Sequence, residues 1–186
     1  MKYIQTSSAE RARFQICAAV LAFLLCIAPA SQAEQIQVGF SPEGSAEALV
    51  LNVIQSSKHQ LRLMGYSFTS PKVVKALIAA SRRGVDVRIV LDAHGNANRS
   101  SRAAMNMIVN AGIPLRTNGA FKIQHDKVII GDGLNVQTGS FNYSTAAARS
   151  NSENALVMWG FPEVANLYLE HWQSRWDQGE PYQSAY

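Results

Sequence analysis

Residues 125–153 read HDKVIIGDGLNVQTGSFNYSTAAARSNSE and contain the most informative pattern of the chain. Residues 123–130, where this stretch begins, are apolar and β-branched enough to indicate a strand. Because side chains alternate between the two faces of a strand, we expect His125 and Lys127 to point the same way and Asp126 to point the opposite way. The pattern therefore predicts an imidazole and an ammonium group side by side.

The end of a second expected strand, over residues 135–138, brings further polar groups. The same two-residue period puts Ser140 and Asn142 together, and Gly139 would let a ligand approach the backbone closely. An imidazole, an ammonium, a hydroxyl and an amide would then converge. Three donors beside one imidazole suit a tetrahedral oxyanion such as a phosphodiester.

Strand-like and helical patterns alternate on both sides of this stretch. We expect further strands at 36–40, 60–68, 85–91, 115–117 and 154–158, and helices at 45–55, 72–83, 100–110 and 161–176. This alternation predicts an α/β sandwich with a mixed β-sheet, built as a single domain over residues 34–186.

Residues 1–33 have the anatomy of a secretory signal peptide. An uncharged apolar run at 16–28 is followed by Pro29 and by small residues up to Ala33, and it is preceded by the basic residues Lys2, Arg11 and Arg13. The alternative is an uncleaved anchor, but the run is shorter than the roughly 20 residues that span a bilayer. We expect cleavage after Ala33, a periplasmic or secreted protein, and no stable membrane anchoring afterwards.

Composition limits the chemistry of the mature chain. Both cysteines, Cys17 and Cys26, lie in the predicted signal, so thiol nucleophiles, disulfides and thiolate metal sites are excluded. Removing three basic residues and one acidic residue from 17 and 13 leaves 14 and 12, which is a net charge of +2. This charge is a weak argument for a nucleic-acid partner, so the argument depends on local placement.

The pattern H-x-K-x₄-D-x₆-G-S-x-N resembles the signature of the phospholipase D superfamily at every position. Its matching residues are His125, Lys127, Asp132, Gly139, Ser140 and Asn142. The single copy, small size and secretory signal are most similar to the Nuc-type bacterial endonucleases of that superfamily. Residues 65–71, GYSFTSP, also resemble a segment of those nucleases.

The resemblance implies a role for each matching residue, and a fold with helices on both faces of the sheet. His125 would attack phosphorus and form a phosphohistidine that water hydrolyses. Lys127 and Asn142 would hold the phosphate, and Ser140 would support the site. Glu153 resembles the carboxylate that hydrogen-bonds the second nitrogen of the histidine ring, which orients a nucleophilic imidazole. Asp132 and Gly139 would be structural.

A single motif implies a two-fold homodimer. In-line displacement needs a nucleophile on one side of phosphorus and an acid on the other, and one His-x-Lys motif cannot occupy both sides. Two copies of His125 at one shared site would supply both groups. No metal or other cofactor is expected, because lysines and neutral donors would offset the phosphate charge.

The sequence thus predicts a metal-independent phosphodiesterase, most simply a non-specific DNA endonuclease, with RNA as an alternative substrate. The second hypothesis is a phospholipase D or phosphatidyl transferase, and the third is a nucleic-acid-binding protein that does not cut. Further substrate contacts are expected from Ser67, His94 and Lys122. A basic rim is expected from Arg99, Arg102, Arg116, Lys122 and Arg149.

Overall fold

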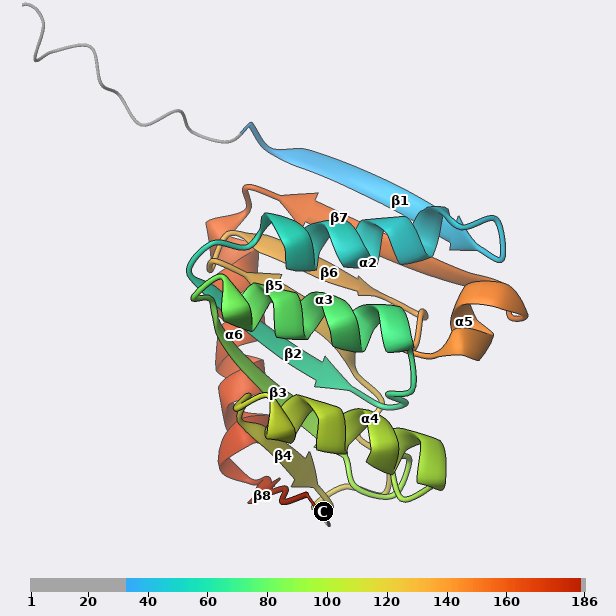
Figure 1. Ribbon diagram of the computed structural model, residues 1–186. Coiled ribbons are helices and arrows are strands. Elements are labelled where there is room, and N and C mark those ends of the chain that lie inside the picture. Colours follow the sequence, from blue (N-terminus) through green and yellow to red (C-terminus); the bar gives the residue numbers. More distant parts are fainter. Residues whose placement is uncertain (1–32, 185–186) are drawn as a thin grey trace, which may run out of the picture. The chain divides into compact units, whose positions relative to one another are not determined.

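The computed structural model describes residues 33–184, so the predicted signal lies outside the described residues apart from its last residue, Ala33. The elements follow in the order β1 (Gln35–Ser41), α2 (Ser45–Ser56), β2 (Gln60–Gly65), α3 (Pro71–Arg82), β3 (Asp86–Asp92), α4 (Arg99–Asn110), β4 (Leu115–Asn118), β5 (Lys127–Gly131), β6 (Asn135–Gly139), α5 (Thr145–Arg149), β7 (Glu153–Trp159), α6 (Pro162–Asp177) and β8 (Glu180–Pro181) (Figure 1).

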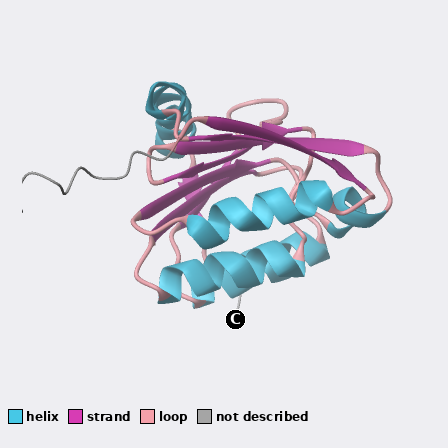
Figure 2. Cartoon of the chain, turned by 90° about the horizontal axis from the view of Figure 1, so that it is seen from above, coloured by secondary structure: helices cyan, strands magenta, loops and turns pink. Residues whose placement is uncertain are grey.

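The strands of the described residues form one mixed sheet in the order β1-β7-β6-β5-β2-β3-β4-β8. Strands β2, β3 and β4 are parallel to one another, and the remaining pairings are antiparallel. Helices α2, α3 and α4 lie on one face, and α6 lies on the other (Figure 2). The predicted α/β fold, a mixed sheet with helices on both faces, is confirmed.

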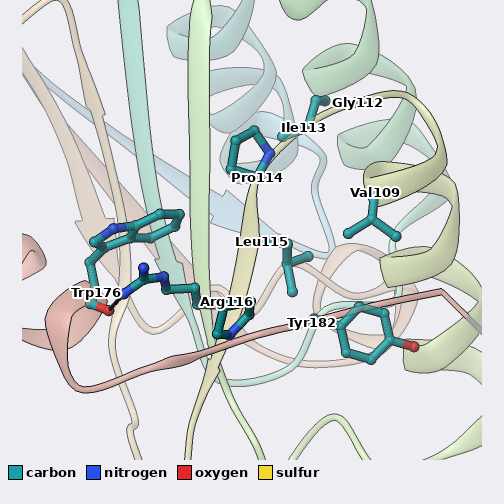
Figure 3. A pocket seen from close by; sticks show the side chains of 9 residues that line it. Val109, Gly112, Ile113, Pro114, Leu115, Arg116, Trp176 and Tyr182 are labelled. Atoms are coloured by element: carbon teal, nitrogen blue, oxygen red, sulfur yellow. Dashed lines mark hydrogen bonds between the residues drawn. The ribbon is translucent and has the colours of Figure 1, made fainter.

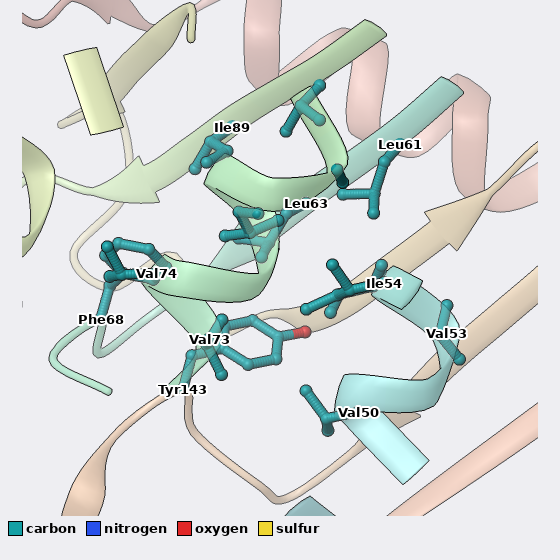
Figure 4. Packing of buried hydrophobic residues seen from close by; sticks show 14 of the residues in the cluster. Val50, Val53, Ile54, Leu61, Leu63, Phe68, Val73, Val74, Ile89 and Tyr143 are labelled. Atoms are coloured by element: carbon teal, nitrogen blue, oxygen red, sulfur yellow. The ribbon is translucent and has the colours of Figure 1, made fainter. Parts of the chain in front are cut away.

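Each central strand contributes to two hydrophobic cores. In β2, Leu61 and Leu63 pack under α2 and α3, where they meet Ile54 and Val74 (Figure 4). The intervening Met64 points to the other face and packs in the cluster that α6 covers. A fully buried side chain of this size stabilises the fold by about 1.5–3 kcal/mol, which explains why the central strands are nearly continuously apolar.

Helix caps fix where two loops leave the sheet. Ser70 accepts a hydrogen bond from the Val73 backbone N–H, and Pro71 begins α3. Asn98 caps α4 in the same way through the Ser101 backbone N–H. These caps hold the β2–α3 and β3–α4 loops at the ends of the parallel strands, which is where α/β proteins place their ligand sites.

The strand expected over 123–130 begins only at Lys127, so His125 is not part of a strand. Lys127 is paired with Gly65, the last residue of β2, so residues 123–126 have no strand opposite them there. Gln124 instead donates its backbone N–H to the Asp92 carboxylate at 2.7 Å. His125 therefore lies in an irregular segment just before β5.

Candidate functional site

The predicted site residues gather where β2 and β6 end and β5 and β7 begin. The register pairs Gly65 with Lys127 and Gly139 with Ala155. Because these four strands are antiparallel neighbours in the sheet, their termini meet at one end of it. The sheet therefore brings the His125–Lys127 pair close to Ser140 and Glu153, although they lie far apart in sequence.

His125 is exposed, and its ring stands against the ring of Tyr66. The two ring centroids are 4.8 Å apart, with an angle of 60° between the ring planes. The Lys127 Nζ donates a hydrogen bond of 2.7 Å to the His125 carbonyl and lies 5.4 Å from the centre of the Tyr66 ring. Tyr66 thus contacts both members of the pair. The sequence pattern does not predict a role for Tyr66, although this residue lies within the GYSFTSP segment.

Two buried polar residues, Asp92 at the end of β3 and Asn96 in the loop after it, connect Tyr66 with the His125 segment. Asn96 donates to the carbonyls of Tyr66 and Asp92, and its side-chain oxygen accepts from the Phe68 backbone N–H. The Asp92 carboxylate accepts from the backbone N–H groups of Gly95 and Gln124. Both residues are almost fully buried. Asp92 and Asn96 therefore act as a structural hub behind the site.

The environment of Lys127 is unusual for an amine. Only 6% of the residue is exposed, and burial lowers the pKa of its ammonium group below the ordinary value. The carboxylates of Asp126 and Glu153 act in the opposite direction and raise this pKa. A desolvated cation at this end of the sheet is a candidate anchor for an anionic group.

Ser140 and Asn142 lie just past the end of β6 and not on a strand. The Ser140 hydroxyl accepts hydrogen bonds from the backbone N–H and side-chain amide of Asn154, at 3.0 and 3.3 Å. The side-chain oxygen of Asn142 is buried and has no hydrogen-bond partner within residues 33–184. Buried polar atoms without partners are uncommon, so this amide is a candidate for a contact with a ligand.

Gly139 is required by the neighbouring strand. Its φ is +139°, and a Cβ at this position would lie 2.5 Å from the Asn154 carbonyl oxygen. Gly139 therefore lies in a structural contact, as the resemblance implies. It makes room for the backbone of β7, whose Asn154 also carries the hydrogen bonds to Ser140.

Glu153 begins β7 at the same end of the sheet, but its carboxylate is engaged elsewhere. Its Oε1 accepts a hydrogen bond of 2.9 Å from the Asn151 side chain. Within the described part of the chain, no hydrogen bond joins Glu153 to the His125 ring. The contact expected from the resemblance is thus absent here, and the effect of Glu153 that the structure contains is electrostatic, on Lys127.

Asp132 lies at the opposite end of β5. Its carboxylate accepts the backbone N–H groups of Lys58, His59 and Gln60 at distances from 2.7 to 3.2 Å. Asp132 itself has a positive φ of 56°. It therefore ties the turn before β2 to the turn after β5, and the structure does not bring it near His125.

The remaining predicted contacts lie around the site. His94 and Lys122 are exposed in the loops that follow β3 and β4, and Ser67 is half-buried next to Tyr66. Over residues 33–184 there is no group of three or more His, Cys, Asp or Glu side chains arranged to hold a metal ion. In the same residues, no helix is long and apolar enough to cross a membrane.

A hollow of about 380 Å³ at the sheet edge by α4 and β4 is lined mainly by apolar side chains such as Val109 and Leu115 (Figure 3). Arg116, expected in the basic rim, lies here instead. Its guanidinium group donates to the Trp176 carbonyl at 2.9 Å and lies 4.6 Å from the centre of the Trp176 ring. Arg116 is therefore a packing residue, and the expectation that it faces substrate is wrong.

The fold and this arrangement of residues match one protein family. A sequence model described as "Cardiolipin synthase, PLD-like domain" matches residues 50–176, more than half of the chain. The protein belongs to this phospholipase D-like family, which confirms the resemblance seen in the sequence.

Three similar proteins have more specific descriptions than the family model. The crystal structure of Nuc from Salmonella typhimurium, described as a phospholipase D family member, is 58% identical with a TM-score of 0.81, covering 82% of this chain and all of that one. Phospholipase D of Rickettsia conorii is 31% identical over 76% of this chain and 69% of its own. Mitochondrial cardiolipin hydrolase of Mus musculus is 30% identical, and the match covers 74% of this chain and 61% of that protein.

Proposed function

We propose that this protein is a metal-independent phosphodiesterase that cuts DNA with little sequence preference. The observation that carries the proposal is the pairing of an exposed imidazole, His125, with the buried amine of Lys127, which is hydrogen-bonded to the His125 carbonyl. The likeness to Nuc favours the nuclease reading within the family. RNA is the alternative nucleic-acid substrate.

The proposed reaction proceeds in two displacements. An imidazole nitrogen of His125 attacks phosphorus, the N–P bond forms, and the bond to the leaving oxygen breaks. The leaving oxygen takes a proton from an acid on the opposite side. Water then gives a proton to the conjugate base of that acid and attacks phosphorus, the N–P bond breaks, and the imidazole is released. No oxidant or reductant is needed at either step.

The other residues at this end of the sheet would support these steps. The Lys127 ammonium and the Asn142 amide are proposed to hold the phosphate oxygens, whose charge grows in the transition state. Ser140 is proposed to support the site through its hydrogen bonds with Asn154. Glu153 is proposed to orient the His125 ring through a carboxylate oxygen other than the Oε1 that accepts from Asn151.

We propose that the acid is the second His125 of a two-fold homodimer. On β1, the alternate residues Ile36, Val38 and Phe40 are 53–58% exposed. They share one face of an edge strand, so they form an apolar stripe. Phe40 is paired with Asn154, so the stripe leads directly to the site. A second copy seated on this stripe would lie beside the site that needs it.

The second candidate is a phospholipase D acting on lipid head groups. The names of the Rickettsia conorii and Mus musculus relatives, phospholipase D and cardiolipin hydrolase, favour it. The proposed chemistry contacts only the phosphodiester, which DNA and phospholipids share. Substrate choice must therefore come from surfaces outside the His125–Lys127 pair.

One experiment tests the proposal and separates the candidates. The mature protein is incubated with plasmid DNA or phosphatidylcholine vesicles, each with EDTA, beside His125→Ala and His59→Ala. His59 is exposed at the opposite end of the sheet, so it provides a matched control. We expect DNA cleavage that survives EDTA and is lost only in His125→Ala. Choline release without DNA cleavage would support the lipase reading, and DNA retention without cutting would support a binding protein.

We also propose that the protein acts in the periplasm or outside the cell. The support is the anatomy of residues 1–33, of which the structure describes only Ala33. Measurement of the mature N-terminus by mass spectrometry tests this, with Glu34 expected as the first residue. No cofactor is part of the proposal, and the EDTA arm above tests this point directly.

A further inference from the structure

A hollow opens directly beside His125, in the segment that joins β4 to β5. It has a volume of about 360 Å³ and is lined by Phe121, Ile123, Gln124, His125, Asp126 and Arg175. Its size is within the range of small-molecule sites. Because His125 is one of the lining residues, a group bound in the hollow would be attached close to the phosphorus that His125 attacks.

The walls of the hollow combine apolar surface with one guanidinium group. Ile123 is 49% exposed, which is unusual for a residue of this type. Arg175 reaches from α6 and lies 4.5 Å from the centre of the Phe121 ring. A flat aromatic ring with a stacked guanidinium, next to an exposed aliphatic side chain, is a surface on which a nucleobase can stack.

The third feature is the side chain of Gln124. The residue is 2% exposed, and neither its amide nitrogen nor its amide oxygen has a hydrogen-bond partner within residues 33–184. Leaving a buried amide unpaired costs free energy. One donor and one acceptor on a single amide match the hydrogen-bonding edge of a base.

Other ligands fit the hollow less well. Asp126 is part of the lining and carries a carboxylate, which disfavours a second phosphate, although His171 lies 3.3 Å from one of its oxygens. Arg175 disfavours a cationic head group such as choline. A neutral aromatic ring with polar edges is compatible with all of these side chains.

We propose that this hollow binds the nucleobase next to the scissile phosphate, with Ile123 and Arg175 as its main contacts and Gln124 as its polar contact. The proposal rests on the nuclease function proposed above and deepens it. A base in a duplex is stacked and paired, so it must leave the helix to enter the hollow. It follows that single-stranded nucleic acid is the preferred substrate.

The test uses short single-stranded oligonucleotides in which only one phosphodiester can be cut, because its neighbours are methylphosphonates. One substrate is intact, and two others carry an abasic residue on either side of the cleavable phosphate. Wild type, Ile123→Ser and Arg175→Gln are compared. The matched control is Leu134→Ser, since Leu134 is 40% exposed in the β5–β6 turn at the other end of the sheet.

We expect wild type to cleave the intact oligonucleotide at least tenfold faster than one of the two abasic ones. Ile123→Ser and Arg175→Gln should slow cleavage of the intact substrate and leave the cleavage rate of that abasic substrate unchanged. In these variants the ratio of the intact rate to the abasic rate should therefore approach one. Leu134→Ser should behave as wild type. Equal wild-type rates on all three substrates, or variants that slow all three equally, would overturn the proposal. If wild type cleaves none of the three oligonucleotides, the proposed nuclease function is refuted as well.

Discussion

At the scale of single residues, the candidate site contains a cation, Lys127, whose charged form is disfavoured by burial. Lys127 is buried beside Tyr66, and its ammonium group is desolvated there. Functional residues are often the ones that cost stability, because a group poised to bind an anion lacks a permanent partner for its charge. The hydrogen bond to the His125 carbonyl offsets only part of this cost.

Lys127→Met should therefore abolish phosphodiesterase activity and raise the melting temperature at pH 7. Burial lowers the pKa of Lys127 in the folded state, so the unfolded chain binds the proton more tightly and the wild-type residue destabilises the fold while it is protonated. The gain should shrink as the pH rises above about 10, where the unfolded lysine also loses its proton. Calorimetry at pH 7 and pH 10.5 checks this, and a lower melting temperature at pH 7 would contradict it.

The carboxylate of Asp126 should set the pH at which activity is lost on the alkaline side. It raises the pKa of Lys127, so Asp126→Asn should lower this pKa further and move the alkaline limb of the kcat/KM profile to lower pH. His171→Gln breaks the contact with Asp126 but leaves the Asp126 carboxylate charged, so the alkaline limb should stay at the same pH. Asp177→Asn, at an exposed position of α6, is the control. An unmoved limb in Asp126→Asn would refute this role.

At the scale of elements, the turns at the two ends of β5 have different tasks. One end presents His125, and the other is held by the Asp132 carboxylate through three backbone N–H groups. Asp132→Ala leaves these donors without their partner and should cost about 2 kcal/mol of unfolding free energy. Because the residue lies away from the site, kcat should be unchanged. Urea unfolding and a DNA cleavage assay measure the two quantities, and a large loss of kcat in folded protein would contradict the account.

The order and type of most elements could be predicted because the apolar periodicity is clear, as in the β-branched strand β3 and the helix α3. The start of β5 could not. Ile123 and the apolar run at 128–130 suggest one continuous strand, but β2 ends opposite Lys127, and only the fold reveals that residues 123–126 have no partner strand. The short helix α5 was also missed, since its five residues carry almost no periodic signal.

The candidate site was predictable in its identities and less so in its contacts. The spacing of His125, Lys127 and Ser140 in the sequence is enough to predict them as candidates. Tyr66 could not be identified from the sequence, because a lone tyrosine after a strand carries no recognisable pattern. Only the fold places Gly95 and the His125 ring against it. The close packing of Gly139 against β7 likewise depends on strand pairing between distant residues.

At the scale of the whole molecule, the proposed reaction requires two copies of the chain. The stripe of Ile36, Val38 and Phe40 is proposed as the contact, so Val38→Lys should place a charge in it, shift the protein to monomer and reduce DNA cleavage by at least tenfold. Leu167→Lys, at a 67% exposed position of α6, is the comparison and should leave both unchanged if the stripe alone forms the contact. Light scattering at the assay concentration reads the oligomeric state. A fully active Val38→Lys monomer would refute the shared site.

The central claim is that the His125 ring becomes bonded to phosphorus during the reaction. Its most direct test is rapid mixing of the protein with a single-stranded oligonucleotide, a quench in alkali, which preserves phosphohistidine, and peptide mass spectrometry. The account predicts a nucleotide fragment attached to the peptide that contains His125, at a level that rises and falls during one turnover. Cleavage with no such adduct at any time, or with the adduct on another residue, would contradict it.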